Sequence, residues 1–452
     1  MNKRLIAFLA LFTTAINLSF IQANATIKSG SACFELGQSR VISGKTYTCV
    51  GKLTWKESRV QSKLEIFSWW ASGGEAEGFK RMADFFAFSN PKVEFLNAAN
   101  IGPTKFKSKS ILLSRLAAGN PPDTFQTHAG AELSSYVKDG QLEDLSFLYK
   151  QQGWNKVFPA DLIKTITSEK KIYSVPVNIH RTNVLWWNPA TAAKAGITSP
   201  PKTIKEFIVN LEKFKSIGVD GIALAGQGDW AIAHLFDSVL LATLGATKYE
   251  GLFNGRTSWL GIEVVNAIEN LQRILSFGNS SKSLGWPEAG RLLTSGKAGY
   301  FIMGDWTTSQ WQSEGLVLGK DLDWAPSPGT TGIFQWMSDS FTLPKRAKNR
   351  EAGIAWLKVC GSLIGQDVFS LEKGSIPVRT DIDSTNYDSY QKSSMVDWKT
   401  NKLVGSIVHG VNYDNAGMAA FNAAVGQYYK EGAINNAQFA EALNSAYRSN
   451  GR

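Results

Sequence analysis

Apolar and polar positions alternate along most of the chain, and their spacing switches repeatedly between that of strands and that of helices. Residues 64–70 are rich in Leu, Ile, Phe and Trp, which predicts a short β-strand. After a Gly73-Gly74 turn, apolar residues recur at helical spacing from Ala76 to Phe86, which predicts a helix. The two segments together form the first unit of an α/β pattern.

The same alternation continues to the end of the chain. The capping-box pattern Thr203-x-x-Glu206 opens a predicted helix that ends near residue 214. Other helices are expected at 108–118, at 231–244 and from 416 onward, and strands at 92–98, 123–126, 172–179, 184–187, 221–225 and 298–303. Such alternation is typical of α/β architecture.

Two adjacent tryptophans, Trp69 and Trp70, stand at the carboxyl end of the first strand, and Glu75 follows them. In open α/β sheets, ligands bind outside the carboxyl ends of the strands. A flat indole beside a carboxylate suits a sugar, which has apolar C–H faces and a rim of hydroxyls. Glu75 also completes the capping-box pattern Ser72-x-x-Glu75, so a capping role and a ligand role both stay open.

Composition places the chain among globular proteins with more than one domain. It has 452 residues, enough for two or more domains. Only 19% of the residues are charged and 12% are aromatic, including 15 Trp, which excludes a disordered chain. Trp and Tyr generally serve burial or binding, so their number favours a protein with an aromatic-lined site.

The N-terminus reads as an export signal. Lys3 and Arg4 precede an apolar stretch at 5–20, and Ala23-Asn24-Ala25 fits a cleavage site, so residues 1–25 are expected to be a signal peptide. We expect a secreted, periplasmic or cell-envelope protein. A lipid anchor would need a Cys at the cleavage point, and no convincing lipobox is present.

Residues 26–62 form a small basic extension with six basic and two acidic side chains, within a chain of net charge +10. No Lys/Arg-rich run is interleaved with aromatics, so nucleic acid is not expected as a partner. Cys33 and Cys49 share this extension in an exported chain, which predicts a disulfide. Cys360 lies in a helical pattern and is expected to be a buried thiol.

The sequence contains four histidines. His128, His180 and His409 stand in polar, turn-like settings, whereas His234 lies in an apolar helix and is expected to be structural. None of the common zinc spacings occurs, so we expect neither a metal nor another cofactor.

Nucleophile and nucleotide-binding motifs, such as G-x-S-x-G and the P-loop, are also absent from the sequence. Separated carboxylates such as Glu75 and Asp339 still allow a glycosidase pair.

Several motifs together resemble one protein family. The chain resembles family 1 extracellular solute-binding proteins of ABC sugar importers, and most of all their glucose/mannose-binding members, over about residues 63–430. The motifs are Phe67-Ser68-Trp69-Trp70, Asn120-Pro121-Pro122-Asp123-Thr124-Phe125-Gln126, Ser174-Val175-Pro176-Val177-Asn178-Ile179-His180-Arg181, Met303-Gly304-Asp305-Trp306, Trp324-Ala325-Pro326-Ser327-Pro328-Gly329 and Gly405-Ser406-Ile407-Val408-His409-Gly410.

This resemblance implies a two-lobed, type II periplasmic-binding-protein-like fold with hinge strands and the ligand in the cleft. The N-lobe would comprise 63–178 and 333–376, and the C-lobe 179–332 and 377–452. It also favours the ligand role for Glu75. The residues expected to bind the sugar are Glu75, Gln126, His128, Asp339, Lys373 and His409 through polar contacts, and Trp69, Trp70, Trp286 and Trp306 as stacking and wall positions.

The expected function is therefore a non-catalytic, monomeric binding protein. It would deliver a monosaccharide, either glucose or a related hexose such as mannose or galactose, to the permease subunits of an ABC transporter. Two alternatives remain open: a secreted carbohydrate-active hydrolase and a metal-binding receptor.

Overall fold

The protein was analysed as a computed structural model, which describes residues 28–29, 31, 39–42, 45–50, 54–59, 61–70, 73–98, 105–431 and 435–450. The predicted signal peptide, Cys33 and Ser72 lie outside the described residues. The signal peptide, the Cys33–Cys49 disulfide and the capping box at Ser72 therefore stay predictions. Cys360 is a buried free thiol, as expected, and burial raises its pKa.

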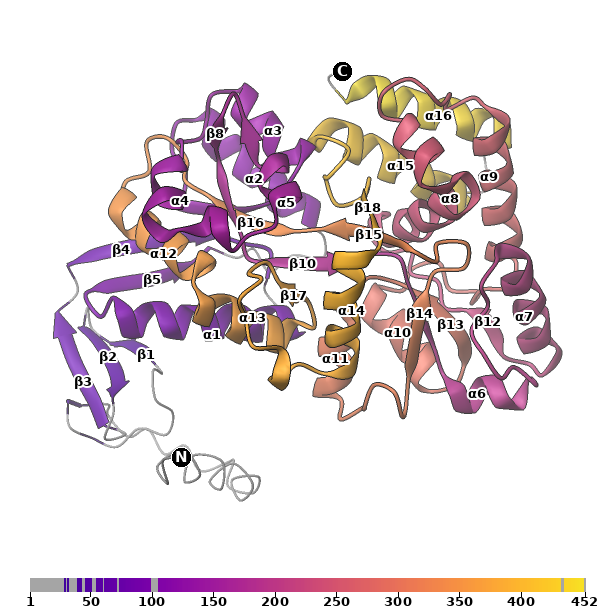
Figure 1. Cartoon of the computed structure of the whole chain (residues 1–452), viewed down its shortest axis with the longest axis horizontal. Helices are drawn as coiled ribbons and strands as arrows, with labels where there is room; N and C mark the ends of the chain where they lie inside the picture. The colour runs from indigo at the N-terminus through magenta and orange to yellow at the C-terminus, as the bar shows by residue number, and fades with distance from the viewer. Residues whose placement is uncertain are drawn as a thin grey trace.

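Two α/β lobes lie side by side (Figure 1). The first lobe is built on a five-stranded sheet in which β4 pairs in parallel with β5 and β6, and β16 runs antiparallel to β6 and β9. In sheet order the strands are β5 (Val93–Asn97), β4 (Ser62–Phe67), β6 (Thr124–His128), β16 (Asp339–Thr342) and β9 (Ser174–Pro176). Its helices are α1 (Gly73–Ser89), α2 (Lys105–Ala117), α3 (Ala131–Lys138), α4 (Ser146–Gln152), α5 (Ala160–Thr165), α12 (Arg350–Gly361) and α13 (Leu363–Lys373).

The second lobe is built on a four-stranded sheet, in the order β12 (Asp220–Ile222), β13 (Ala298–Ile302), β11 (Val184–Trp187) and β14 (Asp323–Pro326). Its helices are α6 (Pro189–Lys194), α7 (Ile204–Ser216), α8 (Trp230–Gly251), α9 (Ile262–Leu275), α10 (Trp286–Thr294), α11 (Thr307–Ser313), α14 (Ser389–Thr400), α15 (Asn415–Glu431) and α16 (Asn436–Ser449).

A third sheet joins the lobes, in the order β17 (Ile376–Pro377), β10 (Asn178–Arg181), β15 (Ile333–Met337) and β18 (Lys402–Gly405). β10 directly follows β9 of the first lobe, and β15 directly precedes β16. Figure 1 shows β10 and β15 running from one lobe toward the other. The chain thus passes between the lobes in short paired strands. These strands lie near the predicted lobe boundaries, which stay a prediction.

The N-terminal extension contributes a separate antiparallel sheet, β1 (Ser39–Ile42), β2 (Lys45–Val50) and β3 (Thr54–Arg59), drawn beside the first lobe in Figure 1.

Two local expectations were wrong. The expected strand at 172–179 is divided among β8 (Lys171–Ile172), β9 and β10, because these three segments pair in three different sheets. Gly73 and Gly74 begin α1 instead of forming a turn. Thr203 caps α7 as expected, but Glu206 accepts from the backbone N–H of Lys202, so only half of the capping box forms.

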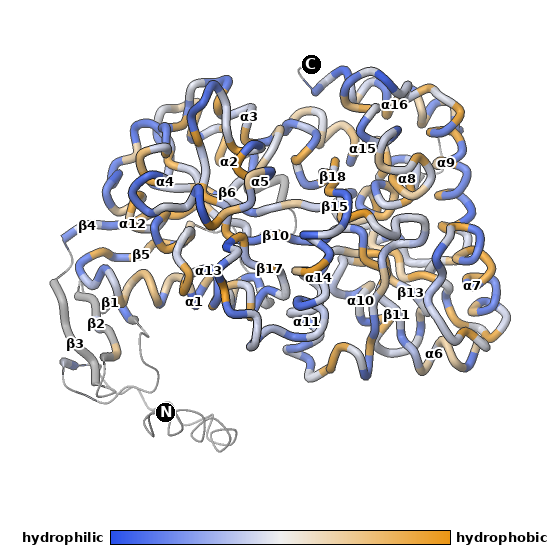
Figure 2. Tube along the Cα trace, in the orientation of Figure 1, coloured by the Kyte–Doolittle hydropathy of each residue, from blue (hydrophilic) through white to orange (hydrophobic). Residues whose placement is uncertain are grey.

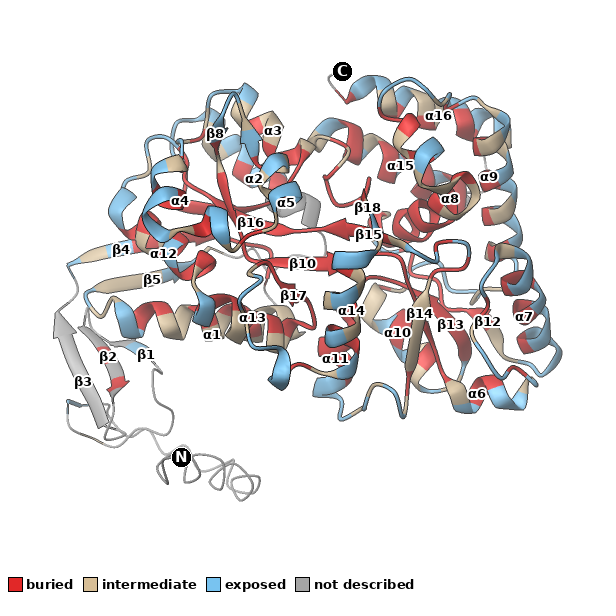
Figure 3. Ribbon diagram, in the orientation of Figure 1, coloured by how far each residue is buried: buried red, intermediate tan, exposed pale blue. Residues whose placement is uncertain are grey.

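The core lies along the sheets of both lobes, where Figure 3 shows buried residues and Figure 2 shows apolar segments, with hydrophilic stretches on the outer helices. Among the described helices, α8 is long and apolar enough to cross a membrane, but 67% of its most apolar window is buried inside the protein. That burial is expected of a core helix. The bent pair α12–α13 passes the same test only if it is counted as one span.

Candidate functional site

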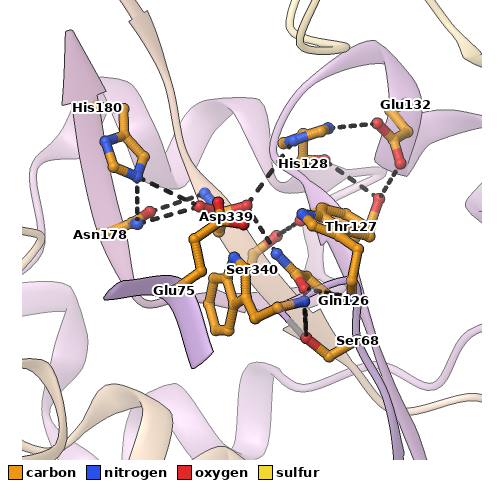
Figure 4. Close-up of polar contacts among 12 residues, drawn as sticks. Ser68, Glu75, Gln126, Thr127, His128, Glu132, Asn178, His180, Asp339 and Ser340 are labelled. Atoms are coloured by element: carbon orange, nitrogen blue, oxygen red, sulfur yellow. Dashed lines mark hydrogen bonds and ion pairs between the residues drawn. The ribbon is translucent and has the colours of Figure 1, made fainter. Parts of the chain in front are cut away.

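The centre of the site is Asp339, where β16 starts. Asp339 is the register partner of His128 at the end of β6, and its side chain is buried. Gln126 Nε2 donates to Asp339 Oδ1 at 2.8 Å, and Asn178 Nδ2 donates to Oδ2 at 3.0 Å (Figure 4). A carboxylate oxygen has two lone pairs and is able to accept more than one hydrogen bond, so Asp339 is suited to bind a ligand donor as well.

His128 is held by a buried ion pair behind it. Its Nδ1 lies 2.6 Å from Glu132 Oε2, which also accepts from Lys109 Nζ at 2.8 Å. Burial alone would raise the pKa of Glu132, but the charges and hydrogen bonds of Lys109 and His128 outweigh it and lower the pKa to about 2. Because Glu132 is therefore a carboxylate, Nδ1 carries the proton of the neutral imidazole, and Nε2 is left as an acceptor.

Nε2 of His128 faces Asp339 Oδ1 at 3.8 Å and has no hydrogen-bond partner among the described residues. Burial lowers the pKa of His128, with Glu132 acting in the opposite direction, so the ring stays neutral at neutral pH. Two acceptors thus face the same space, which is suited to a ligand that donates, such as a hydroxyl.

Trp69 forms one wall of the site. Its ring centroid lies 5.1 Å from that of His128, and Lys109 Nζ lies 5.5 Å from the Trp69 ring. The backbone N–H of Trp69 donates to Gln126 Oε1 at 3.3 Å, and Ser68 Oγ donates to the same atom at 2.7 Å. Gln126 therefore links the Trp69 backbone to Asp339.

The second lobe contributes Trp306 and His409. Their ring centroids lie 5.0 Å apart, and His409 lies 5.9 Å from His128 of the first lobe. His234 Nδ1 lies 3.1 Å from His409 Nε2, and its ring packs on Trp306 at 5.4 Å. The expectation that His234 only packs within its helix was wrong, because α8 places it directly behind the predicted ligand residue His409.

Asp237, one turn further along α8, holds the segment that carries His409. Its Oδ2 accepts from Ser406 Oγ at 2.8 Å and from the backbone N–H of Ile407 at 3.0 Å, and Oδ1 accepts from Tyr249 OH at 2.6 Å. Burial raises the pKa of Asp237 to about 6, although these hydrogen bonds act to lower it.

Glu75 and Lys373 are brought together from the start of α1 and the end of α13. Lys373 Nζ donates to Glu75 Oε1, and the Lys373 side chain is buried. The two predicted polar residues thus form an ion pair with each other, and Figure 4 includes Glu75 in the region of Asp339.

Trp70 and Trp286 do not join this cluster. Trp70 packs in the core of the first lobe, 4.4 Å from Phe369 and 5.6 Å from Phe341. Its predicted wall position is therefore not supported. Trp286 begins α10 and is half-buried, and in the described residues no ring contact links it to Trp69 or Trp306.

The sequence reasoning missed a second histidine at Asp339. His180 Nε2 lies 3.7 Å from Asp339 Oδ2 and 3.0 Å from Asn178 Nδ2, while its Nδ1 bonds Asp305. Asn178 and His180 stand two apart on β10, so they share one face of that strand. Two polar residues on one face of a buried strand were the signal available in the sequence.

A small cavity lies where the lobes meet, with a volume of about 20 Å³. That is room for about one water molecule, so a larger ligand requires the lobes to part. Lys109 and His128 line it from the first lobe, and Trp230, Val408, His409, Met418 and Asn422 from the second. Within the described chain, no cluster of three His, Cys, Asp or Glu side chains is able to hold a metal ion.

Comparisons with known proteins agree with this architecture. Residues 80–366 match the family model of bacterial extracellular solute-binding proteins. An uncharacterised ABC transporter extracellular-binding protein of Pyrococcus horikoshii is 32% identical over 386 residues, 84% of this chain and 87% of that protein. A probable sugar-binding periplasmic protein of Rhizobium meliloti is 31% identical over 361 residues, 78% of this chain and 86% of its own.

Solved structures show the same fold at lower identity. The bacterial solute receptor AcbH, described as exclusively preferring β-D-galactopyranose, superposes with a TM-score of 0.76 at 17% identity over 86% of this chain and all of AcbH. A chitin oligosaccharide binding protein has a TM-score of 0.75 at 20% identity, over 87% of this chain and all of that protein. The family match, the two relatives and the two-lobed fold lead to one conclusion: the chain belongs to the bacterial extracellular solute-binding protein family.

Proposed function

We propose that the protein is the sugar-binding component of an ABC importer that works outside the cytoplasm. It holds a monosaccharide, glucose or a related hexose, between its lobes and delivers it to the permease. The observation that carries the proposal is the meeting of Asp339, His128 and Trp69 of the first lobe with Trp306 and His409 of the second. The Rhizobium meliloti relative is named a probable sugar-binding periplasmic protein, which supports a sugar as the ligand.

The chemistry of the cluster suits a sugar better than other small solutes. A hexose loses its water hydrogen bonds on burial, and each one left unmade costs about 1–3 kcal/mol. Asp339 and the Nε2 atom of His128 both accept hydrogen bonds from hydroxyls, and charged acceptors give the stronger ones. The indoles of Trp69 and Trp306 offer apolar faces to the C–H groups.

The resemblance to glucose/mannose-binding members favours a monosaccharide over a longer sugar. The cavity between the lobes has a volume of about 20 Å³, too small for any sugar, so its size does not discriminate between ligand lengths. The structural neighbours include both a galactopyranose receptor and a chitin oligosaccharide binder, so the fold alone does not choose between ligand sizes.

Titration calorimetry tests the proposal with glucose, galactose, mannose, xylose, maltose and chitobiose against the mature protein. We expect saturable, one-to-one binding of one or more hexoses and much weaker binding of the disaccharides. Binding of only the disaccharides would contradict the monosaccharide assignment, and the absence of any sugar binding would contradict the proposed function.

A further inference from the structure

Asn422 is a buried polar side chain that makes no side-chain hydrogen bond to any described residue. It lies on α15 and is 2% exposed, and both its amide nitrogen and its amide oxygen lack a hydrogen-bond partner among the described residues. A buried amide left in this way is destabilising, and buried polar groups in native proteins are nearly always paired. The amide therefore needs a partner beyond the described residues, and a bound ligand would supply one.

The surroundings of Asn422 indicate what that partner is. Asn422 lines the cavity between the lobes, opposite His128 and Lys109 of the first lobe and beside His409. Met418, one helical turn earlier on α15, lines the same cavity, whereas Phe421 packs in the core against Phe236. The amide thus faces the site and not the solvent.

We propose that Asn422 is a ligand-contacting residue of the second lobe, with its amide hydrogen-bonded to a sugar hydroxyl in the closed complex. This inference rests on the proposed function. The groups that Asp339 and His128 turn toward the site only accept hydrogen bonds, whereas an Asn amide also donates. Asn422 therefore supplies a donor from the second lobe, in addition to Lys109 of the first lobe on the same cavity, and it selects among sugars by the position of the oxygen that accepts.

Substitution of Asn422 by Leu separates a ligand contact from a structural role. Leu is of similar size and removes the unsatisfied amide, so the melting temperature of the free N422L protein should not fall. The affinity for glucose, or for the hexose that the calorimetric screen selects, should fall about tenfold or more, because one hydrogen bond is worth roughly this factor.

Asn210 provides the matched control. It is also a buried Asn, but its Nδ2 donates to Tyr300 OH at 3.0 Å, away from the cavity. The N210L protein should therefore melt at a lower temperature than the parent and bind the sugar with unchanged affinity.

Monodeoxy analogues of the same sugar complete the test. One analogue lacks the hydroxyl that is bonded to Asn422. The parent should bind this analogue more weakly than the intact sugar, whereas N422L should bind the two with equal affinity. If N422L and the parent bound the intact sugar with equal affinity, this inference would be overturned but the proposed function would not. The amide would then be a binding site for water. The inference would also be overturned if N422L bound every analogue more weakly than the parent by the same factor, because no single hydroxyl would then be the partner of Asn422. A parent that binds none of the sugars would overturn the proposed function as well.

Discussion

Asp339 shows how one buried carboxylate organises residues from distant parts of the chain. Gln126 and Asn178 each donate to one of its oxygens, and the Nε2 atoms of His128 and His180 lie 3.8 and 3.7 Å from it. Its position in the site follows from the register of β16 against β6, which pairs it with His128. A sugar hydroxyl that donates to Asp339 replaces water at a charged acceptor, which makes this the strongest polar contact we expect.

Replacing Asp339 by Ala should therefore weaken sugar binding by about 1.5–3 kcal/mol, the range for hydrogen bonds to charged groups. Calorimetric titration measures this loss. Asp381→Ala is the matched control, because Asp381 is an exposed carboxylate bonded to Arg379. If D339A bound the sugar as tightly as the parent and D381A, the central role of Asp339 would be refuted.

At the scale of elements, the sequence predicted most strands and helices but not how they meet. The helix that contains His234 was expected, but its contact with His409, 175 positions away, depends on how α8 packs against the segment after β18. Trp69 and Trp70 look alike in the sequence, yet Trp69 packs on His128 of the site and Trp70 packs on Phe369 of the core.

The resemblance predicted ligand roles for Glu75, Gln126, His128, Asp339, Lys373 and His409. In the structure their partners are polar or aromatic, and their ligand roles stay a prediction. It did not locate Glu132 or Lys109, because their role is to support His128 and a single sequence carries no motif for it. For Asn422 the sequence does carry a signal, because it is a polar residue on the buried face of a helix between Met418 and Val425.

The contact between α8 and the His409 segment predicts that the stability of the protein depends on pH. Burial raises the pKa of Asp237 to about 6 from an ordinary value of 3.8. The folded state therefore holds the proton more tightly than the unfolded state, and stability falls as pH rises from about 4 to about 6. In D237N this dependence should be absent.

Urea unfolding of parent and D237N at several pH values measures the effect. The stability of the parent relative to D237N should decrease by an amount on the order of 3 kcal/mol between about pH 4 and pH 6 and then level off. A difference between the two proteins that does not change with pH would show that folding does not raise the pKa of Asp237.

For the whole molecule, the proposed function predicts that the two lobes close over the ligand. In the structure, α1 of the first lobe packs against α11 of the second, and a Cβ at Gly74 would lie 2.2 Å from Ser309 Cβ. Only a residue without a side chain allows this approach. Because the cavity holds about one water, the protein must open to admit a sugar.

Gly74→Ala should therefore favour the open form. The free protein should be no less stable, since Ala is a better helix former than Gly, but sugar affinity should fall because closure is hindered. Gly78→Ala is the matched control, because a Cβ there meets Phe369 of the same lobe at 3.1 Å. Calorimetry and thermal melting of both variants give the comparison. Equal affinities of G74A and G78A would argue against closure at this contact.

The central claim, that the sugar lies between the lobes and closes them, is tested most directly by small-angle X-ray scattering. The radius of gyration of the parent should decrease on saturation with the hexose identified by calorimetry, because contacts from both lobes couple binding to closure. G74A should show a smaller decrease at the same saturation. A parent that binds the sugar by calorimetry but scatters identically with and without it would contradict the account.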